Sequence, residues 1–484
     1  MARSGTPAVA PSQHSLGLAL AWLWLAGGCA TLSPPDHQQI QAQALGGAQP
    51  PAQWASVAAT GEVSDAWIAS FGDRRLDALV AEAIAHNTDL RIAATRVQQA
   101  DAAVDVAQGQ LYPAIGVLAR ASSKPIDDLV AVVSGAVLKV WWEIDLWGRL
   151  RYARNAAVAS RDASSADYRF ARQSIAAATA RAWFLVAETA QQREIAMAMA
   201  DSGQQLVTLS QQRWKVGAGS EQDVTLARAN LALYQDSVQQ IDLAHRQASR
   251  ALEVLLGRFP RAELEAGALP TMPDPVPAGI PAQVLERRPD LIAAEHRVAA
   301  AFNRVGEAKA ARLPGLTLGA NAGRIADDLN GLENGRDRSI ESAGGSLVAP
   351  IFLGGTLSAQ VQLRNAEQEQ ALADYARLAL QAVQEVEDAL DAEQVLAERE
   401  RILRAALVDN QRTLELQQSA FGVGKIDMRA VAQSGLAVYA AQVVLLQVQR
   451  ERLSRRVGLH LALGGDFDLA TTAPIATADV SATR

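Results

Sequence analysis

The stretch GRLRYARNAAVASRDASSADYRFARQ, residues 148–173, opens a segment that extends to Gly257 and decides the fold of this chain. The segment returns as GTLSAQVQLRNAEQEQALADYARLAL, residues 355–380, which extends to Gly464. A shift of 207 positions superposes the two segments without a gap. A duplication of this length indicates two copies of one structural unit, each of which completes the other.

Each copy has the pattern of two long helices joined by a tight turn. From Leu150 to Arg213 there is no proline, alanines are frequent, and larger apolar residues are separated by polar runs. At 1.5 Å per residue such a helix would be roughly 100 Å long, which is typical of coiled coils rather than compact domains. Glycines, which favour the end of a helix, mark the turns at Val216-Gly217-Ala218 and Val423-Gly424-Lys425. Helical hairpins are therefore predicted over 148–257 and 355–464, and a soluble helical scaffold explains them equally well.

A second duplication, with an offset of 201, precedes each long hairpin. It superposes a helix predicted from Thr88 to Leu111 on one that opens with Arg288-Pro289-Asp290, and it superposes Pro113 on Pro314. Proline in the first helical turn loses no hydrogen bond, and the adjacent acid interacts favourably with the helix dipole. Because the two offsets differ by six residues, an insertion must lie between the proline and the long helix, where we expect loops.

The segments between those prolines and the long helices alternate between apolar and polar residues. The apolar positions are Leu138, Val140, Trp142 and Ile144 in the first repeat and Leu316, Leu318, Ala320 and Ala322 in the second. A period of two with charge on one face only is typical of strands in a sheet with an apolar face and a wet face. We therefore predict β-hairpins over 113–146 and 314–351. The first is short, either because its outer loop is short or because one strand is reduced.

Aromatic residues gather where these strands meet the long helices, at Tyr112, Trp141, Trp142 and Trp147. Such a group is typical of the girdle that transmembrane strands place at the membrane interface. Packing of the same rings in a protein core is the alternative interpretation.

Two hairpins supply four strands, which are too few to close a barrel. Open strand edges are not tolerated in lipid. Several copies would therefore have to pool their strands, and three copies would supply twelve, an even number within the range of outer-membrane barrels. A ring of such copies is a cyclic oligomer that would set the helical hairpins side by side as a tube.

The start of the chain has the pattern of a processing signal. An apolar run from Leu16 to Leu25 is too short for a membrane span but suits a secretory signal peptide, predicted over 1–28. The following Ala26-Gly27-Gly28-Cys29 is similar to the lipobox of bacterial lipoproteins and predicts a lipid on Cys29, the only cysteine in the sequence. An ordinary cleaved signal with a chance cysteine is the alternative. Residues 29–66 are predicted to be a lipid anchor and an extended linker, because Pro, Gln, Ala and Gly dominate them.

Composition and motifs argue against several classes of function. A net charge of −7 argues against a nucleic-acid-binding protein, which normally carries a basic face. No uninterrupted apolar run reaches 18 residues, so we expect no transmembrane helix, and strands would have to make any passage through a membrane. The six histidines show no ligand spacing, and no nucleophile elbow or phosphate-binding glycine loop is present. We therefore predict no enzymatic activity, no cofactor and no metal site.

Four motifs carry a resemblance to a known family: Trp142-Glu143-Ile144-Asp145-Leu146-Trp147-Gly148-Arg149, Arg288-Pro289-Asp290-Leu291, Pro350-Ile351-Phe352-Leu353-Gly354-Gly355 and Leu461-Ala462-Leu463-Gly464-Gly465. They resemble, in order, the motifs of TolC-like outer membrane efflux proteins of the NodT/OprM-like lipoprotein branch. The resemblance implies a mainly α fold with long coiled-coil hairpins that form a periplasmic tunnel, and four β-strands per chain in a homotrimeric, twelve-stranded outer-membrane barrel. It implies a passive efflux channel for drugs or other toxic small molecules. The partners would be a periplasmic adaptor (membrane fusion protein) and an inner-membrane transporter of the RND type.

The resemblance also assigns candidate site residues. The tips of the helical hairpins, where adaptors dock, would be Val216, Gly217, Ala218, Val423, Gly424 and Lys425. Many relatives close the periplasmic mouth with aspartates six and nine residues after the second tip glycine, but Ala430 and Gln433 stand there in this chain. Asp223 and Asp427 are therefore the candidates for a gate, and simple helix capping is the alternative.

The expected organisation has a first structural repeat at 67–258, an inter-repeat linker at 259–282, a second repeat at 283–465 and a C-terminal tail at 466–484. Two functional hypotheses remain. The first is the efflux channel, and the second is a lipid-anchored periplasmic coiled-coil scaffold without a pore. The apolar strand faces discriminate between them, because a barrel needs these faces toward lipid and a scaffold needs them buried in protein.

Overall fold

The computed structural model describes residues 31–47, 50–56, 59, 61, 66–121, 134–326, 332–335 and 337–465. The predicted signal peptide, Cys29 and the predicted C-terminal tail lie outside the described residues. The chain forms two compact units, made of Met1–Ala48, Arg96–Ser165 and Ala293–Ala376 in the first and of Gln49–Thr95, Ala166–Ile292 and Arg377–Arg484 in the second. Each unit therefore draws on both sequence repeats.

Long helices dominate the chain. In chain order its elements are α2 (His37–Ala44), the 3-10 helix η2 (Trp67–Phe71), α3 (Arg74–His86), α4 (Thr88–Gly109), β1 (Ala114–Arg120), β2 (Ser134–Ile144), α5 (Arg149–Lys215), α6 (Glu221–Leu255), α7 (Pro281–Arg287), α8 (Pro289–Ala310), β3 (Gly315–Ala326), β4 (Arg338–Val348), α10 (Thr356–Gly422) and α11 (Met428–Ala462). The predicted long helices are confirmed, since α5 and α10 have 67 residues each and α6 and α11 have 35 each. The matching lengths show that the duplication extends to the structure.

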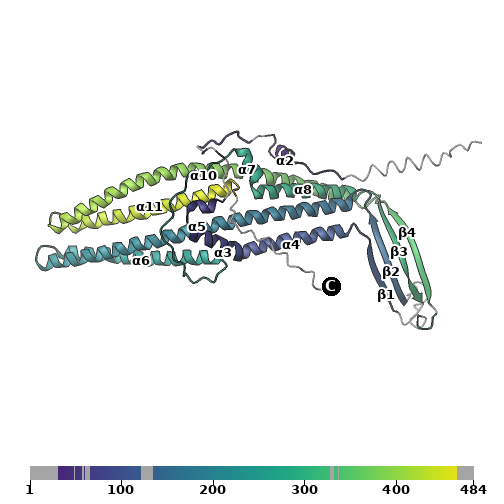
Figure 1. Ribbon diagram of the computed structural model, residues 1–484, viewed down its shortest axis with the longest axis horizontal. Coiled ribbons are helices and arrows are strands. Elements are labelled where there is room, and N and C mark those ends of the chain that lie inside the picture. The colour runs from purple at the N-terminus through teal and green to yellow at the C-terminus, as the bar shows by residue number, and fades with distance from the viewer. Residues whose placement is uncertain are drawn as a thin grey trace, which may run out of the picture. The chain divides into compact units, whose positions relative to one another are not determined.

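The four strands form one antiparallel sheet in the first unit, in the order β1-β2-β3-β4 (Figure 1). The register places Val140 opposite both Ile115 and Ala320. The two predicted apolar stripes therefore lie on the same face, because side chains alternate between faces along each strand. The other face carries polar pairs such as Lys139 opposite Asn321.

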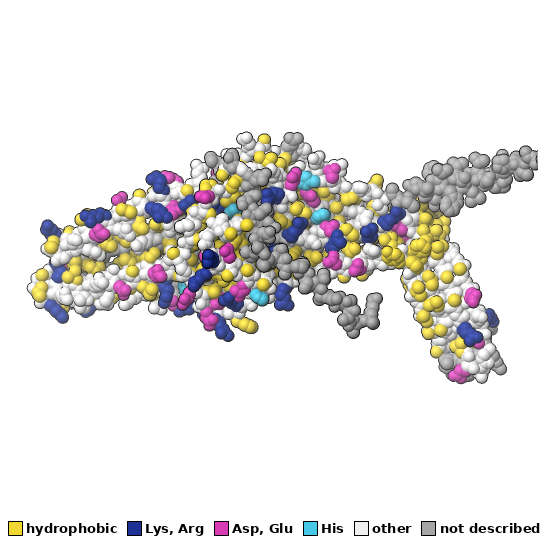
Figure 2. All heavy atoms as spheres, in the orientation of Figure 1, with side chains coloured by type: hydrophobic (Ala, Val, Ile, Leu, Met, Phe, Trp, Pro, Cys, Tyr) yellow, Lys and Arg dark blue, Asp and Glu magenta, His cyan; other side chains and the backbone are white. Residues whose placement is uncertain are grey.

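The apolar face of the sheet is open to the surroundings. Val117 on β1 is 70% exposed, and Leu138 and Leu318 are exposed as well. Figure 2 shows that hydrophobic side chains gather toward the end where the strands meet the helices, whereas charged side chains gather toward the opposite end. An exposed apolar surface of this kind indicates contact with a membrane or with another protein.

The first β-hairpin has one short strand. β1 has seven residues, whereas β2, its partner, has eleven. In the second hairpin β3 has twelve residues and β4 eleven. Of the two explanations for the short first hairpin, the described residues favour the reduced strand.

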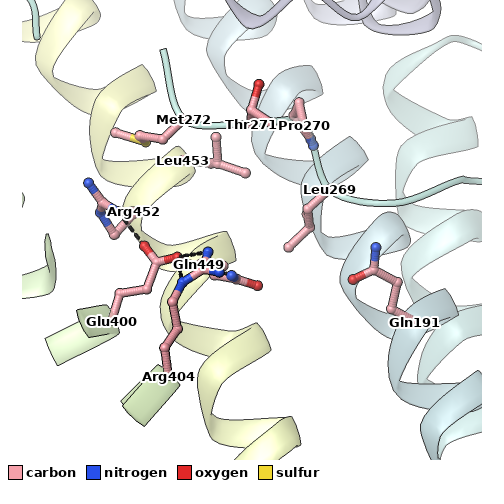
Figure 3. A pocket seen from close by; sticks show the side chains of 10 residues that line it. All are labelled: Gln191, Leu269, Pro270, Thr271, Met272, Glu400, Arg404, Gln449, Arg452 and Leu453. Atoms are coloured by element: carbon pink, nitrogen blue, oxygen red, sulfur yellow. Dashed lines mark hydrogen bonds and ion pairs between the residues drawn. The ribbon is translucent and has the colours of Figure 1, made fainter. Parts of the chain in front are cut away.

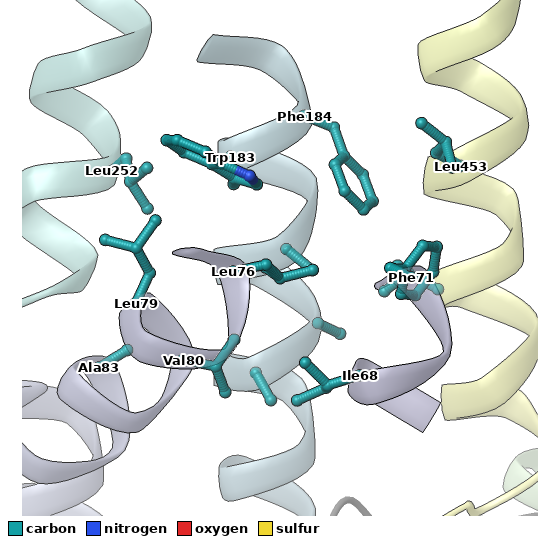
Figure 4. Packing of buried hydrophobic residues seen from close by; sticks show 14 of the residues in the cluster. Ile68, Phe71, Leu76, Leu79, Val80, Ala83, Trp183, Phe184, Leu252 and Leu453 are labelled. Atoms are coloured by element: carbon teal, nitrogen blue, oxygen red, sulfur yellow. The ribbon is translucent and has the colours of Figure 1, made fainter. Parts of the chain in front are cut away.

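In the second unit, α5 and α6 lie side by side, as do α10 and α11, in two helical hairpins (Figure 1). Where these helices meet η2 and α3, buried alanines and larger apolar side chains form a hydrophobic core (Figure 4). Small residues such as Ala176 and Ala180 are fully buried and allow the close approach of neighbouring elements. The larger side chains that fill the core include Leu76, Trp183, Phe184, Leu252 and Leu453.

The expectation of no transmembrane helix stays a prediction, but one described helix has the length and hydropathy of a membrane span. α11 contains an 18-residue window with a mean hydropathy of 1.5, which makes it the one described helix that is long and apolar enough to cross a membrane. Counting uninterrupted apolar runs misses such a helix, because its polar residues are spaced apart. Part of the apolar surface is used in packing, since Val431, Val438 and Leu445 are buried.

The segment predicted as an extended linker contains a short helix, α2. The Asp36 side chain accepts a hydrogen bond from the Gln39 backbone N–H, and the Gln39 side chain accepts one from the Asp36 N–H. This capping box starts the helix, and its Asp-x-x-Gln spacing is a signal that composition alone does not reveal. His37 at the start of α2 contacts the carboxylate of Glu295 on α8 at 2.5 Å, so the segment is attached to the first unit.

Candidate functional site

Both hairpin tips in the second unit share one backbone geometry. Gly217 and Gly424 have φ angles of +72° and +79°, in the left-handed region that glycine adopts without strain. The residue after each glycine donates its N–H to the carbonyl five residues earlier, from Ala218 to Arg213 at 2.8 Å and from Lys425 to Ala420 at 2.9 Å. This is the Schellman motif, which satisfies the last carbonyls of a helix and reverses the chain.

The tips present apolar side chains to solvent. Val216 is 77% exposed and Val423 is 72% exposed. Ala218 and Lys425 occupy exposed positions beside them. The predicted tip residues therefore lie at the ends of the two helical hairpins, where a binding partner can reach them.

Arg213, near the end of α5, connects the first tip to the second. Its guanidinium donates to the carbonyls of Phe421 and Gly422 in the second hairpin and, at 3.0 Å, to the carbonyl of Ala218 in its own. It also lies 4.7 Å from the centre of the Phe421 ring, in a cation–π contact. Sequence reasoning missed this residue. The sequence does contain a signal for it, because the shift of 207 superposes Arg213 on Ala420, so the arginine is present in one repeat and absent from the other.

Both candidate gate acids cap helices. Asp427 is the N-cap of α11 and accepts a hydrogen bond from the Ala430 N–H at 3.2 Å. Asp223 accepts hydrogen bonds from the backbone N–H and the hydroxyl of Ser220 at 3.1 and 2.8 Å, in a capping box that starts α6. This geometry is the one that the capping alternative predicts. A role in gating stays a prediction.

The Asp223 carboxylate also joins the two hairpins. Partial burial raises its pKa, but hydrogen bonds from Ser220 and the influence of the backbone N–H of Met428, the first residue of α11, lower the pKa below its usual value. The charge of Arg213 acts in the same direction. Asp223 is therefore ionised at neutral pH, and together with Arg213 it forms a polar tie between the tips.

A tryptophan-rich motif builds the junction between β2 and α5 in the first unit. The Asp145 carboxylate accepts hydrogen bonds from the backbone N–H groups of Leu150 and Arg151 at 3.0 and 3.1 Å, and so caps α5. The Trp147 indole N–H donates to the carbonyl of Pro314 at 2.8 Å, just before β3. The motif therefore fastens the strand-to-helix turn of the first repeat to the helix-to-strand turn of the second.

The aromatic residues at this end of the sheet are exposed. Tyr112, Trp141, Trp142 and Trp147 each keep more than a third of their surface accessible. The Trp142 indole N–H donates to the Leu111 carbonyl at 2.9 Å. The exposed rings of Trp142 and Trp147, with their anchored indole N–H groups, suit a membrane interface better than core packing, whereas Trp141 lies on the polar face with Lys139.

The second unit also contains a cavity of 370 Å³ whose polar wall is an ion-pair network (Figure 3). The buried Glu400 carboxylate pairs with Arg404 and Arg452 and accepts a hydrogen bond from Gln449 at 3.0 Å. Burial raises the Glu400 pKa, but these donors lower it below its usual value. In the described part of the chain, no group of three His, Cys, Asp or Glu side chains could hold a metal ion. The contacts of Glu400 with Arg452 and Gln449 join α10 to α11.

Comparison with known proteins gives concordant results. The family model "Outer membrane efflux protein" matches residues 79–258 and 280–465. The chain is 31% identical over 459 residues to the pyoverdine export outer membrane protein OpmQ of Pseudomonas putida, across 91% of this chain and 95% of that protein. It is 30% identical over 421 residues to the toluene efflux pump outer membrane protein TtgF of the same species, across 84% of this chain and 87% of that protein.

Solved structures share the fold. The Campylobacter jejuni CmeC outer membrane channel superposes with a TM-score of 0.81 at 21% identity, over 91% of this chain and 95% of that chain. The Vibrio cholerae outer membrane protein VceC superposes with a TM-score of 0.76 at 25% identity, over 84% of this chain and 100% of that chain. The family model spans both repeats, including the hairpin tips and the β2–α5 junction. The chain therefore belongs to the outer membrane efflux protein family.

Proposed function

We propose that this outer membrane protein is the channel of a tripartite efflux pump. Drugs or other toxic small molecules would pass through it passively, from an inner-membrane transporter and a periplasmic adaptor to the outside. Family membership supports a role in efflux, and the names of the relatives, pyoverdine export and toluene efflux, support small molecules as the cargo.

The observation that carries the proposal is the sheet of the first unit, which has two free edges and an exposed apolar face. Among the described residues, β1 and β4 each pair with one strand. In lipid each unsatisfied backbone group costs several kcal/mol, so β4 of one copy would pair with β1 of the next. Three copies supply the twelve strands of a closed homotrimeric barrel. A periplasmic scaffold without a pore would need Leu138 and Leu318 to be covered, and both are exposed.

The hairpin tips would be the adaptor-docking surface. Their exposed valines and glycine turns offer a small apolar contact at the end of each helical hairpin. An RND-type inner-membrane transporter would complete the pump through that adaptor. Asp223 and Asp427 lie at the same end of the hairpins, so they would act on the periplasmic mouth if they contribute to a gate.

The first described residues, which follow the predicted lipidation site Cys29 in sequence, lie close to the sheet. Thr31, two residues later, lies so near the β2–α5 turn that a Cβ at Gly148 would approach its side chain to 2.9 Å. The Leu32 backbone N–H donates to the Tyr152 hydroxyl on α5 at 2.8 Å. The start of the described chain is thus held where the strands end, which supports an anchor in the membrane surface that the strands cross.

Arginine substitutions on adjacent positions of β4 test the proposal. Ala343 lies on the apolar face, opposite Ala320, and Ser342 lies on the other face, opposite Asn321. Ala343→Arg places a charge toward lipid at a cost of about 2 to 4 kcal/mol near the bilayer midplane. We expect it to remove the trimer from outer-membrane fractions and to abolish drug resistance.

Ser342→Arg is the matched control, because its side chain would point into the pore. We expect a normal trimer, with altered single-channel conductance in planar bilayers. Normal trimer and resistance in Ala343→Arg, or a soluble single-chain particle in the unmodified protein, would contradict the channel.

A further inference from the structure

The turn between β4 and α10 exposes two large apolar side chains. Ile351 is 96% exposed and Phe352 is 84% exposed. Gly354 and Gly355, with φ angles of +59° and +82°, then redirect the chain into α10. A phenylalanine displayed in this way contributes little to the packing of its own chain, so a contact outside the chain would account for it.

The equivalent position in the first repeat has the opposite character. The shift of 207 superposes Phe352 on Asp145, whose side chain is only 11% exposed and caps α5. The strand before Asp145, β2, is paired on both sides, whereas the strand before Phe352, β4, is paired on one side. The exposed phenylalanine therefore stands at the free edge of the sheet.

Inside the chain, β2 of the first repeat lies against β3 of the second, and we call this junction the internal seam. It shows what the end of a strand in this sheet contacts. There the β2–α5 turn meets the α8–β3 turn through the bond from Trp147 to Pro314, and both turns line a cavity of 370 Å³. The offset of 201 superposes Leu313 and Pro314 on Tyr112 and Pro113. In a ring of copies that continues this strand order, the β4–α10 turn of one copy meets the α4–β1 turn of the next.

On the basis of the proposed ring, we propose that Ile351 and Phe352 pack against Tyr112 and Pro113 of a second copy, at the seam between β4 and β1. Phe352 stands four residues beyond the last strand residue, Val348, so it lies within about 14 Å of the strand end. Adjacent strands are about 4.8 Å apart, which places the neighbouring α4–β1 turn within that reach.

The chemistry of the two surfaces agrees with this pairing. Tyr112 is 62% exposed in the single chain and offers a ring to the Phe352 ring. Gly354 superposes on Trp147, so the aromatic side chain that bonds across the internal seam is absent from the external one. Phe352 supplies the missing bulk at the external seam.

Photo-crosslinking of the full-length protein in the outer membrane tests the contact. With p-benzoylphenylalanine at position 352, we expect products of two and three chain masses in which the crosslinked peptide contains Tyr112. The same group at Val423, the exposed valine of the second hairpin tip, is the control and should not crosslink to that peptide. Crosslinks from position 352 only to lipid, or to another segment of the second copy, would overturn the inference.

A double-mutant cycle gives an independent readout. Phe352→Ser and Tyr112→Ser should each lower the temperature at which the detergent-solubilised trimer dissociates, and the double variant should lose less than the sum of the two. Phe352→Leu should stay close to the unmodified protein. Additive losses would contradict a direct contact. An intact, conducting trimer without the crosslink overturns this contact alone, whereas a single-chain particle overturns the proposed channel as well.

Discussion

Replacement of Asp223 by alanine should loosen both hairpin tips at once. The carboxylate accepts two hydrogen bonds from Ser220, and the backbone N–H of Met428 on the other hairpin and the charge of Arg213 both lower its pKa. Loss of a capping interaction costs about 1 kcal/mol, and loss of a hydrogen bond to a charged group costs about 1.5 to 3 kcal/mol when buried. Because the site is partly exposed, we expect a total of about 2 kcal/mol, which is roughly a 30-fold change in a local opening equilibrium.

Hydrogen exchange of the purified trimer measures this opening. In Asp223→Ala, amides in residues 213–224 and in residues 421–432 should exchange roughly 30-fold faster, while the sheet is unchanged. Asp223→Asn keeps an acceptor oxygen and should lose less. Unchanged protection around Met428 in the alanine variant would refute the tie between the hairpins.

Acidification provides a second check on the same carboxylate. The pKa of Asp223 is lower in the folded protein than its usual value of 3.8. Its contribution to stability is therefore complete above that value and is lost as the pH falls through the folded-state pKa. If Asp223→Asn instead leaves exchange unaltered but changes ion selectivity in bilayers, the charge acts as a gate and the capping explanation is insufficient.

Three further predictions concern other parts of the chain. Gly424→Trp places a bulky side chain at a φ of +79° beside Arg213, and we expect drug susceptibility with an intact trimer. The control, Gly424→Ala, should retain resistance. Full resistance in the tryptophan variant would show that the tip is not part of the docking surface. Cys29→Ser should abolish incorporation of labelled palmitate, and unmodified protein that takes up no label would indicate an ordinary cleaved signal. Burial lowers the pKa of His460 to about 3, so the free energy of unfolding should fall as the pH drops from about 6.5 toward 3, by up to about 1.4 kcal/mol per pH unit. His460→Phe keeps a ring against Trp67 and should flatten that pH dependence in thermal unfolding. An unchanged slope in this variant would contradict the prediction.

The sequence predicts best those elements whose residue pattern is periodic along the chain or occurs in both repeats. The alternation at Leu138 and Leu318 was sufficient to place both residues on the apolar face, because side-chain direction in a strand depends only on parity. The paired glycines at 217 and 424 located both turns, since the left-handed conformation they adopt is rarely open to other residues.

Contacts between segments distant in sequence were not predictable in the same way. The hydrogen bonds of Arg213 join α5 to backbone carbonyls in the second hairpin. Every residue has a backbone carbonyl, so the sequence does not show which carbonyls accept these bonds. α2 was missed for a different reason, because a single capping box outweighs a composition that otherwise favours an extended chain. Sites that depend on register between helices, such as the placement of the Met428 N–H near the Asp223 carboxylate, therefore require coordinates.

The differences between the two repeats set the symmetry of the proposed assembly. Three copies of a perfect duplication would give six equivalent hairpins, but position 145 is an aspartate cap where 352 is an exposed phenylalanine, and Arg213 stands where its counterpart is Ala420. The ring would therefore have two kinds of seam, one inside each chain and one between chains. It would also have two kinds of tip, one with the neutral Ala218 and one with the positive Lys425. An adaptor that docks at the tips would thus meet two chemically distinct sites in alternation, so its contacts can repeat with threefold but not sixfold equivalence.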